Sequence, residues 1–272
     1  MKSLGEYEPA LSQVMKFIAH DTRFRCRPNL AGILVENPRL VIAISHSTPL
    51  SWLPAIALLT ERACAKGGGD RVPVGVIDRF FFRVPLLREL AKYFSQSDRP
   101  LTFTEFIGHF ENLNGADIVL FPEGSNCFFG EPEDVQEFRS SRFVELAVRV
   151  NAPILIAVHR GSENWAKALP VPSAFLDKLN LLPGFVIDFL EKRLRKSGVL
   201  VLPFFPKPMA KFEMLCELYH PALKKADLSE DKAVLQTQIQ AEGEKVRQRM
   251  KEMLEEIDSE NSLSAIDVAV EK

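Results

Sequence analysis

The sequence predicts a single α/β domain in which helices flank a mostly parallel sheet. Five short runs of β-branched and aliphatic residues have the length of buried strands, and the segments between them are long enough for helices. Their apolar character is continuous rather than alternating, as is typical of parallel strands covered on both faces. A chain of 272 residues with 46% hydrophobic content can bury one such core. The five predicted strands are residues 39–45, 72–77, 116–121, 152–158 and 198–202.

Both ends of the chain are expected to add to this domain. A short helix over residues 7–20 is predicted from its apolar positions at helical spacing. We divide the chain into an N-terminal helical segment (1–37), an α/β domain (38–257) and a flexible tail (258–272). The last helix of the domain is predicted to be amphipathic, with Leu235, Ile239, Val246, Met250, Met253 and Ile257 on its apolar face.

Composition excludes several classes of function. The net charge of -2 gives no general attraction to nucleic acid, so no nucleic-acid partner is expected. The four cysteines are widely spaced, which predicts neither a metal site nor a disulfide framework and favours a reducing compartment. The first eight residues are not apolar enough for a secretory signal, and residues 40–60 contain polar groups that would be costly in a membrane. We therefore expect a cytoplasmic protein.

The strand predicted at residues 39–45 ends at a histidine. His46 follows it directly, Thr48 is a suitable N-cap, and Pro49 suits the first position of a helix. This interpretation places Ser51 in the first helical turn.

A second strand, at residues 116–121, ends in the string Phe121-Pro122-Glu123-Gly124-Ser125. The carboxyl ends of parallel strands meet at one edge of a sheet, where α/β folds bind their ligands. His46 and Glu123 are therefore expected to converge at that edge.

These two strings resemble the motifs of the phospholipid and glycerol acyltransferase superfamily, typified by 1-acylglycerol-3-phosphate acyltransferases. The first motif of that family is His-x4-Asp, and the chain has His46 with Ser51 in place of the aspartate. The third is Phe-Pro-Glu-Gly-Thr-Arg, and the chain has Asn126 in place of the arginine. The resemblance covers roughly residues 38–255, most of the chain.

The resemblance implies O-acyl transfer from an acyl thioester to a hydroxyl of a lysophospholipid, glycerol phosphate or related lipid. The thioester, on CoA or on acyl carrier protein, is a co-substrate, and no metal or other cofactor is implied. His46 would act as base and Ser51 would orient it. Arg99, near the place of the family's phosphate-binding arginine, would hold a phosphate. The acceptor pocket would include Glu123, Gly124 and Ser125.

The residues themselves leave other interpretations open. In one alternative, His46 is a strand-end histidine bonded to backbone, and a serine in a first helical turn often bonds backbone amides. In a second alternative, the loss of the aspartate at Ser51 leaves a protein that binds lipid or an acyl chain without catalysis. In a third, His46 activates water instead of a lipid hydroxyl, and the protein is a thioesterase or another hydrolase. His159 also lies at a predicted strand end and is a weaker candidate. A Cys127 nucleophile is disfavoured, and no Gly-x-Ser-x-Gly elbow of a serine hydrolase is present.

Residues 175–196 combine apolar side chains with a basic run, Lys192-Arg193-Leu194-Arg195-Lys196. Such a segment suits the surface of an anionic bilayer, although the same residues also suit a core helix with a solvated basic end. We expect peripheral attachment to the cytoplasmic face of a membrane, with the lipid acceptor and acyl-CoA or acyl carrier protein as partners.

Overall fold

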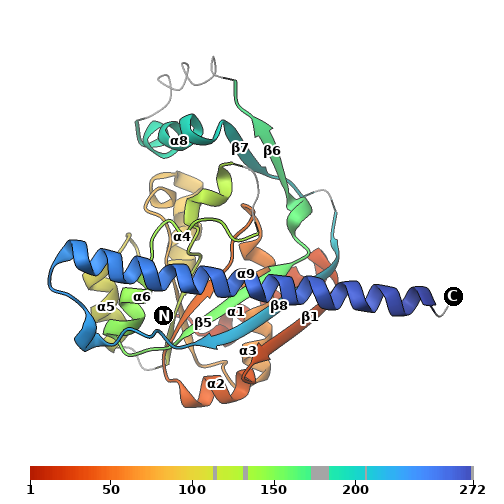
Figure 1. The fold of residues 1–272 in the computed structure, drawn as a ribbon, viewed down its shortest axis with the longest axis horizontal. Coiled ribbons are helices and arrows are strands. Elements are labelled where there is room, and N and C mark those ends of the chain that lie inside the picture. The colour runs from red at the N-terminus through yellow and green to blue at the C-terminus, as the bar shows by residue number, and fades with distance from the viewer. Residues whose placement is uncertain (113–114, 131–133, 173–183, 206, 271–272) are drawn as a thin grey trace.

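A six-stranded sheet with helices on both faces forms the centre of the protein in a computed structural model (Figure 1). The structure describes residues 1–112, 115–130, 134–172, 184–205 and 207–270. The strand order is β1-β8-β5-β2-β4-β3. All neighbours pair in parallel except β5 and β8, which are antiparallel. The predicted α/β fold with a mostly parallel sheet is therefore confirmed. The strands are β1 (Ala19–Arg27), β2 (Leu40–Ile44), β3 (Val72–Gly75), β4 (Ala116–Leu120), β5 (Ile154–Arg160) and β8 (Met209–Tyr219).

Side chains of the central strands alternate between two hydrophobic cores. From β2, Leu40, Ile42 and Ile44 pack on one face, and Val41 and Ala43 pack on the other. The first face is covered by α1 (Leu4–Ile18), α2 (Leu30–Glu36) and α3 (Trp52–Ala65), with α4 (Pro85–Ser95) beside β3. The second is covered by α5 (Phe103–Asn112), α6 (Arg142–Arg149) and the long α9 (Lys232–Val270).

A small second sheet lies beyond one end of the main sheet. It pairs β6 (Ala166–Pro170) with β7 (Val199–Pro203) in antiparallel fashion, and α8 (Gly184–Ser197) lies beside it (Figure 1). Four of the five predicted strands lie in the main sheet. The fifth, residues 198–202, forms β7 of the second sheet instead. The segment that follows it enters the main sheet as β8. Four short 3₁₀ turns complete the described elements: η1 (Phe81–Arg83), η2 (Gly124–Phe128), η3 (Glu163–Trp165) and η5 (Lys225–Asp227).

The N-terminal segment is not purely helical, which corrects the prediction for residues 1–37. The helix ends at Ile18, and β1 follows at the edge of the main sheet. Arg23, Arg25 and Arg27 of β1 pair with acidic side chains of β8 and α9. Because arginine recurs at every second position from Arg23 to Arg27, this half of β1 does not look apolar in the sequence.

The predicted flexible tail is also corrected, since α9 continues as a helix to Val270. Polar side chains beyond residue 257 still contact the sheet. Asp258 pairs with Arg160, whereas Glu260 pairs with Arg23 and Arg25. The apolar face predicted for this helix is confirmed, with Ile239, Val246, Met250, Met253 and Ile257 buried.

One buried ion pair joins the amino-terminal ends of the strands. Arg71 Nε donates to Asp117 Oδ2 at 2.7 Å, and Arg71 Nη1 donates to the carbonyls of Leu34 and Asn37. The other oxygen of Asp117 accepts the N–H of Leu40 at 3.1 Å. A single pair thus connects α2, β2, β4 and the turn before β3.

Breaking this pair should destabilise the protein strongly. Asp117→Asn leaves the Arg71 guanidinium buried without a counter-charge, which should lower the free energy of unfolding by about 3–5 kcal/mol. Urea unfolding measures the change. The matched control is Glu105→Gln, because Glu105 pairs with Arg99 at the surface, where an ion pair contributes little. A similar shift of the urea midpoint in both variants would contradict the role given to Asp117.

Candidate functional site

Two histidines and a glutamate lie at the carboxyl ends of three neighbouring strands. His46 follows β2, Glu123 follows β4, and His159 is near the end of β5. Since β2 lies between β5 and β4, the three residues share one edge of the sheet. The convergence of His46 and Glu123 predicted from the sequence is present.

The His46 imidazole is buried against the ring of Phe121, with a centroid distance of 4.9 Å. Within the described chain, neither ring nitrogen has a partner in hydrogen-bond geometry. Burial, followed by the neighbouring His159, lowers the pKa of His46 to about 4, although the nearby backbone of Pro49 and Gly124 opposes the shift. The ring is therefore a neutral imidazole at physiological pH, and one nitrogen is available to accept a proton.

The His159 imidazole is fixed by a backbone carbonyl. Its Nε2 lies 3.0 Å from the carbonyl oxygen of Ser45, and the ring packs on Phe212. A carbonyl only accepts, so Nε2 carries the hydrogen and Nδ1 has a lone pair. Burial lowers the pKa of His159 to about 4, and its interaction with His46 shows that the two rings are neighbours.

Ser51 does not orient His46, contrary to the role implied by the resemblance. Its hydroxyl donates to the carbonyl of Thr48 at 2.8 Å, and its backbone N–H donates to the same oxygen at 3.1 Å. Residues 48–51 form a turn of their own, so α3 begins at Trp52 with Ser51 as the residue before it. The predicted helix start at Thr48 and Pro49 is therefore wrong by one turn.

Glu123 is completely buried, and neither carboxylate oxygen has a hydrogen-bond partner in the part of the chain that the structure describes. Burial raises its pKa to about 7, although the backbone amides of Glu123 and His46 act against the shift. The carboxyl group is thus poised between its two protonation states near neutral pH. A solvated glutamate is excluded.

The residues after Glu123 form a tight turn that requires glycine. Gly124 has a φ of +54°, and a Cβ there would lie 3.3 Å from Cδ of Arg139. The Arg139 guanidinium donates to the Ser125 hydroxyl at 3.3 Å and forms an ion pair with Asp78. A cation therefore lies beside Ser125, although it comes from a different segment than the motif.

Arg99 and Asn126 stand near or at the places of the family's two arginines in the sequence, but neither side chain lies beside Ser125. Arg99 pairs with Glu105 at the surface and lines a smaller cavity of about 250 Å³ beside Phe103 and Phe106 of α5. The Asn126 side chain donates to the carbonyl of Glu137 at 3.0 Å. The structure thus brings His46, Glu123, Gly124 and Ser125 together and leaves Arg99 outside.

Cys127 stabilises the turn after Glu123 and is not suited to act as a nucleophile. Its Sγ donates to the carbonyl of Gly124 at 3.2 Å, and burial, followed by the neighbouring Glu123, raises the pKa of the thiol well above its usual range. Among the described residues, no three His, Cys, Asp or Glu side chains are grouped to hold a metal ion.

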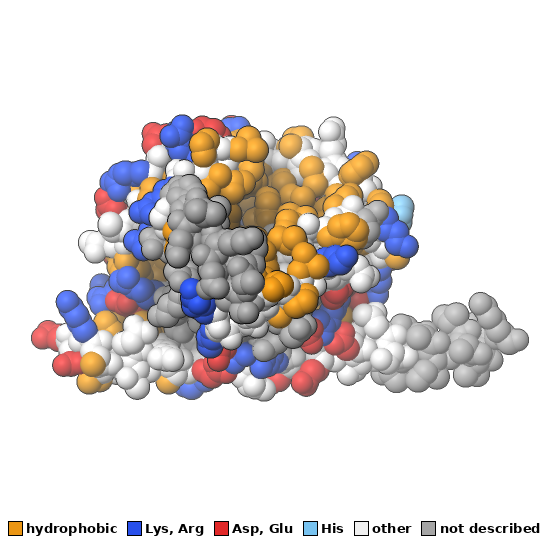
Figure 2. Space-filling view, turned by 90° about the horizontal axis from the view of Figure 1, so that it is seen from above, with side chains coloured by type: hydrophobic (Ala, Val, Ile, Leu, Met, Phe, Trp, Pro, Cys, Tyr) orange, Lys and Arg blue, Asp and Glu red, His pale blue; other side chains and the backbone are white. Residues whose placement is uncertain are grey.

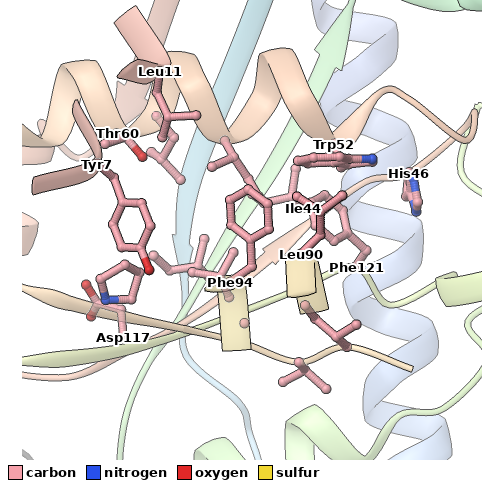
Figure 3. Close-up of a pocket in the computed structure, with 18 of the residues that line it drawn as sticks. Tyr7, Leu11, Ile44, His46, Trp52, Thr60, Leu90, Phe94, Asp117 and Phe121 are labelled. Atoms are coloured by element: carbon pink, nitrogen blue, oxygen red, sulfur yellow. The ribbon is translucent and has the colours of Figure 1, made fainter. Parts of the chain in front are cut away.

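A long apolar cavity of about 530 Å³ begins at His46 and follows β2 along the sheet. Figure 3 shows His46, Trp52 and Phe121 at one end and Tyr7, Thr60 and Asp117 at the other, with Ile44, Leu90 and Phe94 between them. The walls come from α1, α2, α3, α4 and the face of β2 that carries Leu40, Ile42 and Ile44. The wall between the two ends is almost wholly hydrocarbon and aromatic.

The structure adds two residues that sequence reasoning missed or ranked low. Arg139 has no distinguishing pattern around it, and only the fold brings it to Ser125. His159 carried one signal, its place at a strand end, and its position beside β2 depends on the strand order.

The segment 175–196 is described only from Gly184 onward. In α8, Leu194 is buried and Leu190 is partly buried against Phe128 and Phe129, whereas Arg195 and Lys196 are exposed. These leucines pack inward, as in the core-helix alternative; residues 175–183 lie outside the described chain. No helix in the described ranges is both long and apolar enough to cross a bilayer.

No protein-family model and no curated protein matches this chain.

The buried Glu123 predicts a specific dependence of stability on pH. Folding raises the pKa of the carboxyl, so its contribution is full below pH 4.5, its ordinary value, and is lost as the pH rises to about 7. Glu123→Gln removes this loss. Relative to the parent, the variant should therefore gain about 2.5 kcal/mol in unfolding free energy between pH 5 and pH 8.

Urea unfolding at both pH values measures this gain, with Glu111→Gln as the control at an exposed glutamate. If Glu123→Gln and the parent show parallel pH profiles, Glu123 is already ionised throughout this range and its pKa is not raised.

Proposed function

We propose that this protein transfers an acyl group from an acyl thioester, on CoA or on acyl carrier protein, to a hydroxyl group of a lysophospholipid, glycerol phosphate or related lipid. The observation that carries the proposal is the neutral His46 imidazole at the end of a long apolar cavity, with no side chain of the described residues in hydrogen-bond geometry to its nitrogens. The motifs around His46 and Glu123 support it as a resemblance.

The shape of the cavity fits one acyl chain. From Leu40 to His46 the strand direction covers about 20 Å, at roughly 3.3 Å a residue. One leaflet of a bilayer, half of a hydrocarbon core of about 30 Å, has a similar depth. Each methylene group buried against the apolar walls contributes about 0.8 kcal/mol. A chain lying in the cavity would leave its carboxyl end beside His46.

The chemistry follows from that placement. The neutral His46 ring takes the proton of the acceptor hydroxyl as its oxygen attacks the thioester carbonyl, and the imidazolium then gives the proton to the departing thiolate. Burial of the site excludes water, which would otherwise compete as the acceptor. No carboxylate among the described side chains engages the His46 ring, so this base works without the acidic partner of the family's first motif.

Binding of an acyl chain without transfer is the second candidate. The missing acidic partner favours it, because Ser51 donates to the Thr48 carbonyl and the low pKa of His46 makes a weak base. Hydrolysis of the thioester by the same histidine is a third outcome. In each case we place the protein at the cytoplasmic face of a membrane, where both the lipid and the thioester are available.

Incubation of the purified protein with labelled acyl-CoA and a panel of lysolipids separates these outcomes. A new acylated lipid supports transfer, free fatty acid supports hydrolysis, and stoichiometric retention of acyl-CoA without product supports binding alone.

Within the transfer reaction, His46→Gln should lower the rate by about 10²–10⁴, the usual contribution of a general base. Ser51→Ala is the matched control, because Ser51 lies nearby but bonds only backbone. Its rate should stay near that of the parent, with about 1 kcal/mol less stability from the lost hydrogen bond. Rates and urea midpoints are measured for both variants. If His46→Gln and Ser51→Ala lower the rate equally, Ser51 takes part in catalysis and the role assigned to it here is wrong.

Arg139 is the cation that we assign to a phosphate on the acceptor. Arg139→Gln should raise KM for a phosphorylated acceptor about tenfold, as expected for one charge-assisted hydrogen bond, and leave KM for an uncharged acceptor nearly unchanged. Arg99→Gln provides the control, since Arg99 lies outside the main cavity. Steady-state kinetics with the two acceptors tests the assignment, which is wrong if Arg99→Gln has the larger effect.

A further inference from the structure

Exposed apolar side chains gather on the face where the cavity opens. On α4, Leu86, Leu90 and Tyr93 recur at helical spacing, and all three are exposed. At the end of β7, Leu202, Phe204 and Phe205 are exposed as well. Figure 2 shows hydrophobic side chains around a hollow on this side of the molecule. We call these six residues the mouth surface.

The mouth surface borders the cavity on two sides. Leu90 belongs to both, because it lines the cavity and is also half exposed. Opposite α4, Pro203 lines the cavity, and its neighbours Leu202 and Phe204 face solvent. An apolar chain crossing between α4 and β7 would therefore pass from the mouth surface directly into the cavity.

Aromatic contacts hold the β7 side of this surface in place. The ring of Phe205 packs edge-on against Trp165 at 4.6 Å and stacks on Phe17 at 6.5 Å. Phe17, at the end of α1, is itself 71% exposed. Trp165 is buried, so the exposed rings of Phe17 and Phe205 rest on a fixed base.

Positive charge accompanies the apolar residues. The segment 79–95, which includes α4, carries Arg79, Arg83, Arg88 and Lys92 and a single acidic residue, Glu89, which pairs with Arg88 and Lys92 and leaves a net positive charge. Arg79, Arg83 and Arg88 are exposed. Apolar side chains that enter the hydrocarbon boundary and cations at headgroup level are the two terms that attach a protein to an anionic bilayer.

We infer that the mouth surface docks on an anionic lipid bilayer, with Leu86, Leu90 and Phe204 entering the headgroup boundary and the cavity opening towards the membrane. This inference rests on the proposed function, because a membrane-facing mouth lets a lipid acceptor and its acyl chain reach His46 without crossing water. It assigns the membrane contact to α4 and the end of β7 rather than to residues 175–196.

Flotation with vesicles of phosphatidylcholine and phosphatidylserine tests the surface. Leu86→Ser combined with Phe204→Ser should lower vesicle partitioning about tenfold or more, since both side chains are exposed and neither lines the cavity. Val35→Ser is the matched control: Val35 is 84% exposed on α2, at the opposite end of the sheet from β7 (Figure 1). Its partitioning should equal that of the parent.

Depth is tested with Leu86→Trp. Its fluorescence, relative to the parent with Trp52 and Trp165, should shift to the blue on binding and be quenched by lipids brominated on the acyl chain. No vesicle binding by the parent, equal binding by the double variant and the parent, or an unquenched tryptophan at position 86 would each overturn the inference. A protein partner would be indicated instead if the mouth variants lost activity on dissolved acceptors as well.

The two proposals fail separately. If the parent acylates a dissolved, short-chain lysolipid but does not bind vesicles, the docking surface is wrong and the proposed function stands. If it binds vesicles through Leu86 and Phe204 but forms no acyl product with any acceptor, the surface stands and the transfer reaction is wrong.

Discussion

The buried ion pair between Arg71 and Asp117 fixes the register of β2 against β4, and this register places His46 and Glu123 at the same edge of the sheet. Asp117 accepts the N–H of Leu40, and the same two residues lie opposite one another in the pairing of β2 with β4. From that common starting line, six residues lead to His46 on one strand and six lead to Glu123 on the other. Because strands advance by about 3.3 Å a residue, the two side chains reach the edge of the sheet together. A slip of one residue would also turn His46 towards the opposite face of the sheet.

The apolar cavity lowers the stability of the folded protein. Protein interiors are normally close-packed, and an unfilled space lined by hydrocarbon loses dispersion contacts on every wall. The cavity lies between helices α1, α3 and α4 and the face of β2 that carries Leu40, Ile42 and Ile44. A guest that supplies the missing contacts would therefore stabilise the folded protein as it binds, which links occupancy of the cavity to resistance against unfolding.

The sequence predicted the elements whose structure follows from their own residues. It did not predict the elements and side chains whose role depends on a contacting residue elsewhere in the chain. Runs of aliphatic residues predicted β2, β3, β4 and β5, and the ends of β2 and β4 predicted the edge that carries His46 and Glu123. By contrast, β1 and β8 interleave charges with apolar residues, and several of those charges pair with each other or with α9. The Ser51 hydroxyl and the Arg139 guanidinium were misassigned or missed for the same reason. Their roles depend on the neighbour that each one faces, and the neighbour is a property of the fold.

The two edges of the main sheet have a consequence for how copies of this chain meet. An edge strand offers free backbone groups on which a second chain can add a strand and begin to aggregate. At one edge, β1 carries three arginines that form ion pairs with β8 and α9, so an added strand would meet charged side chains rather than an apolar surface. At the other, β3 is short and contains Pro73, which has no N–H to donate, and the Gln96 side chain already occupies its carbonyl. The sheet can thus keep an open, strongly apolar centre without offering its borders to neighbouring chains.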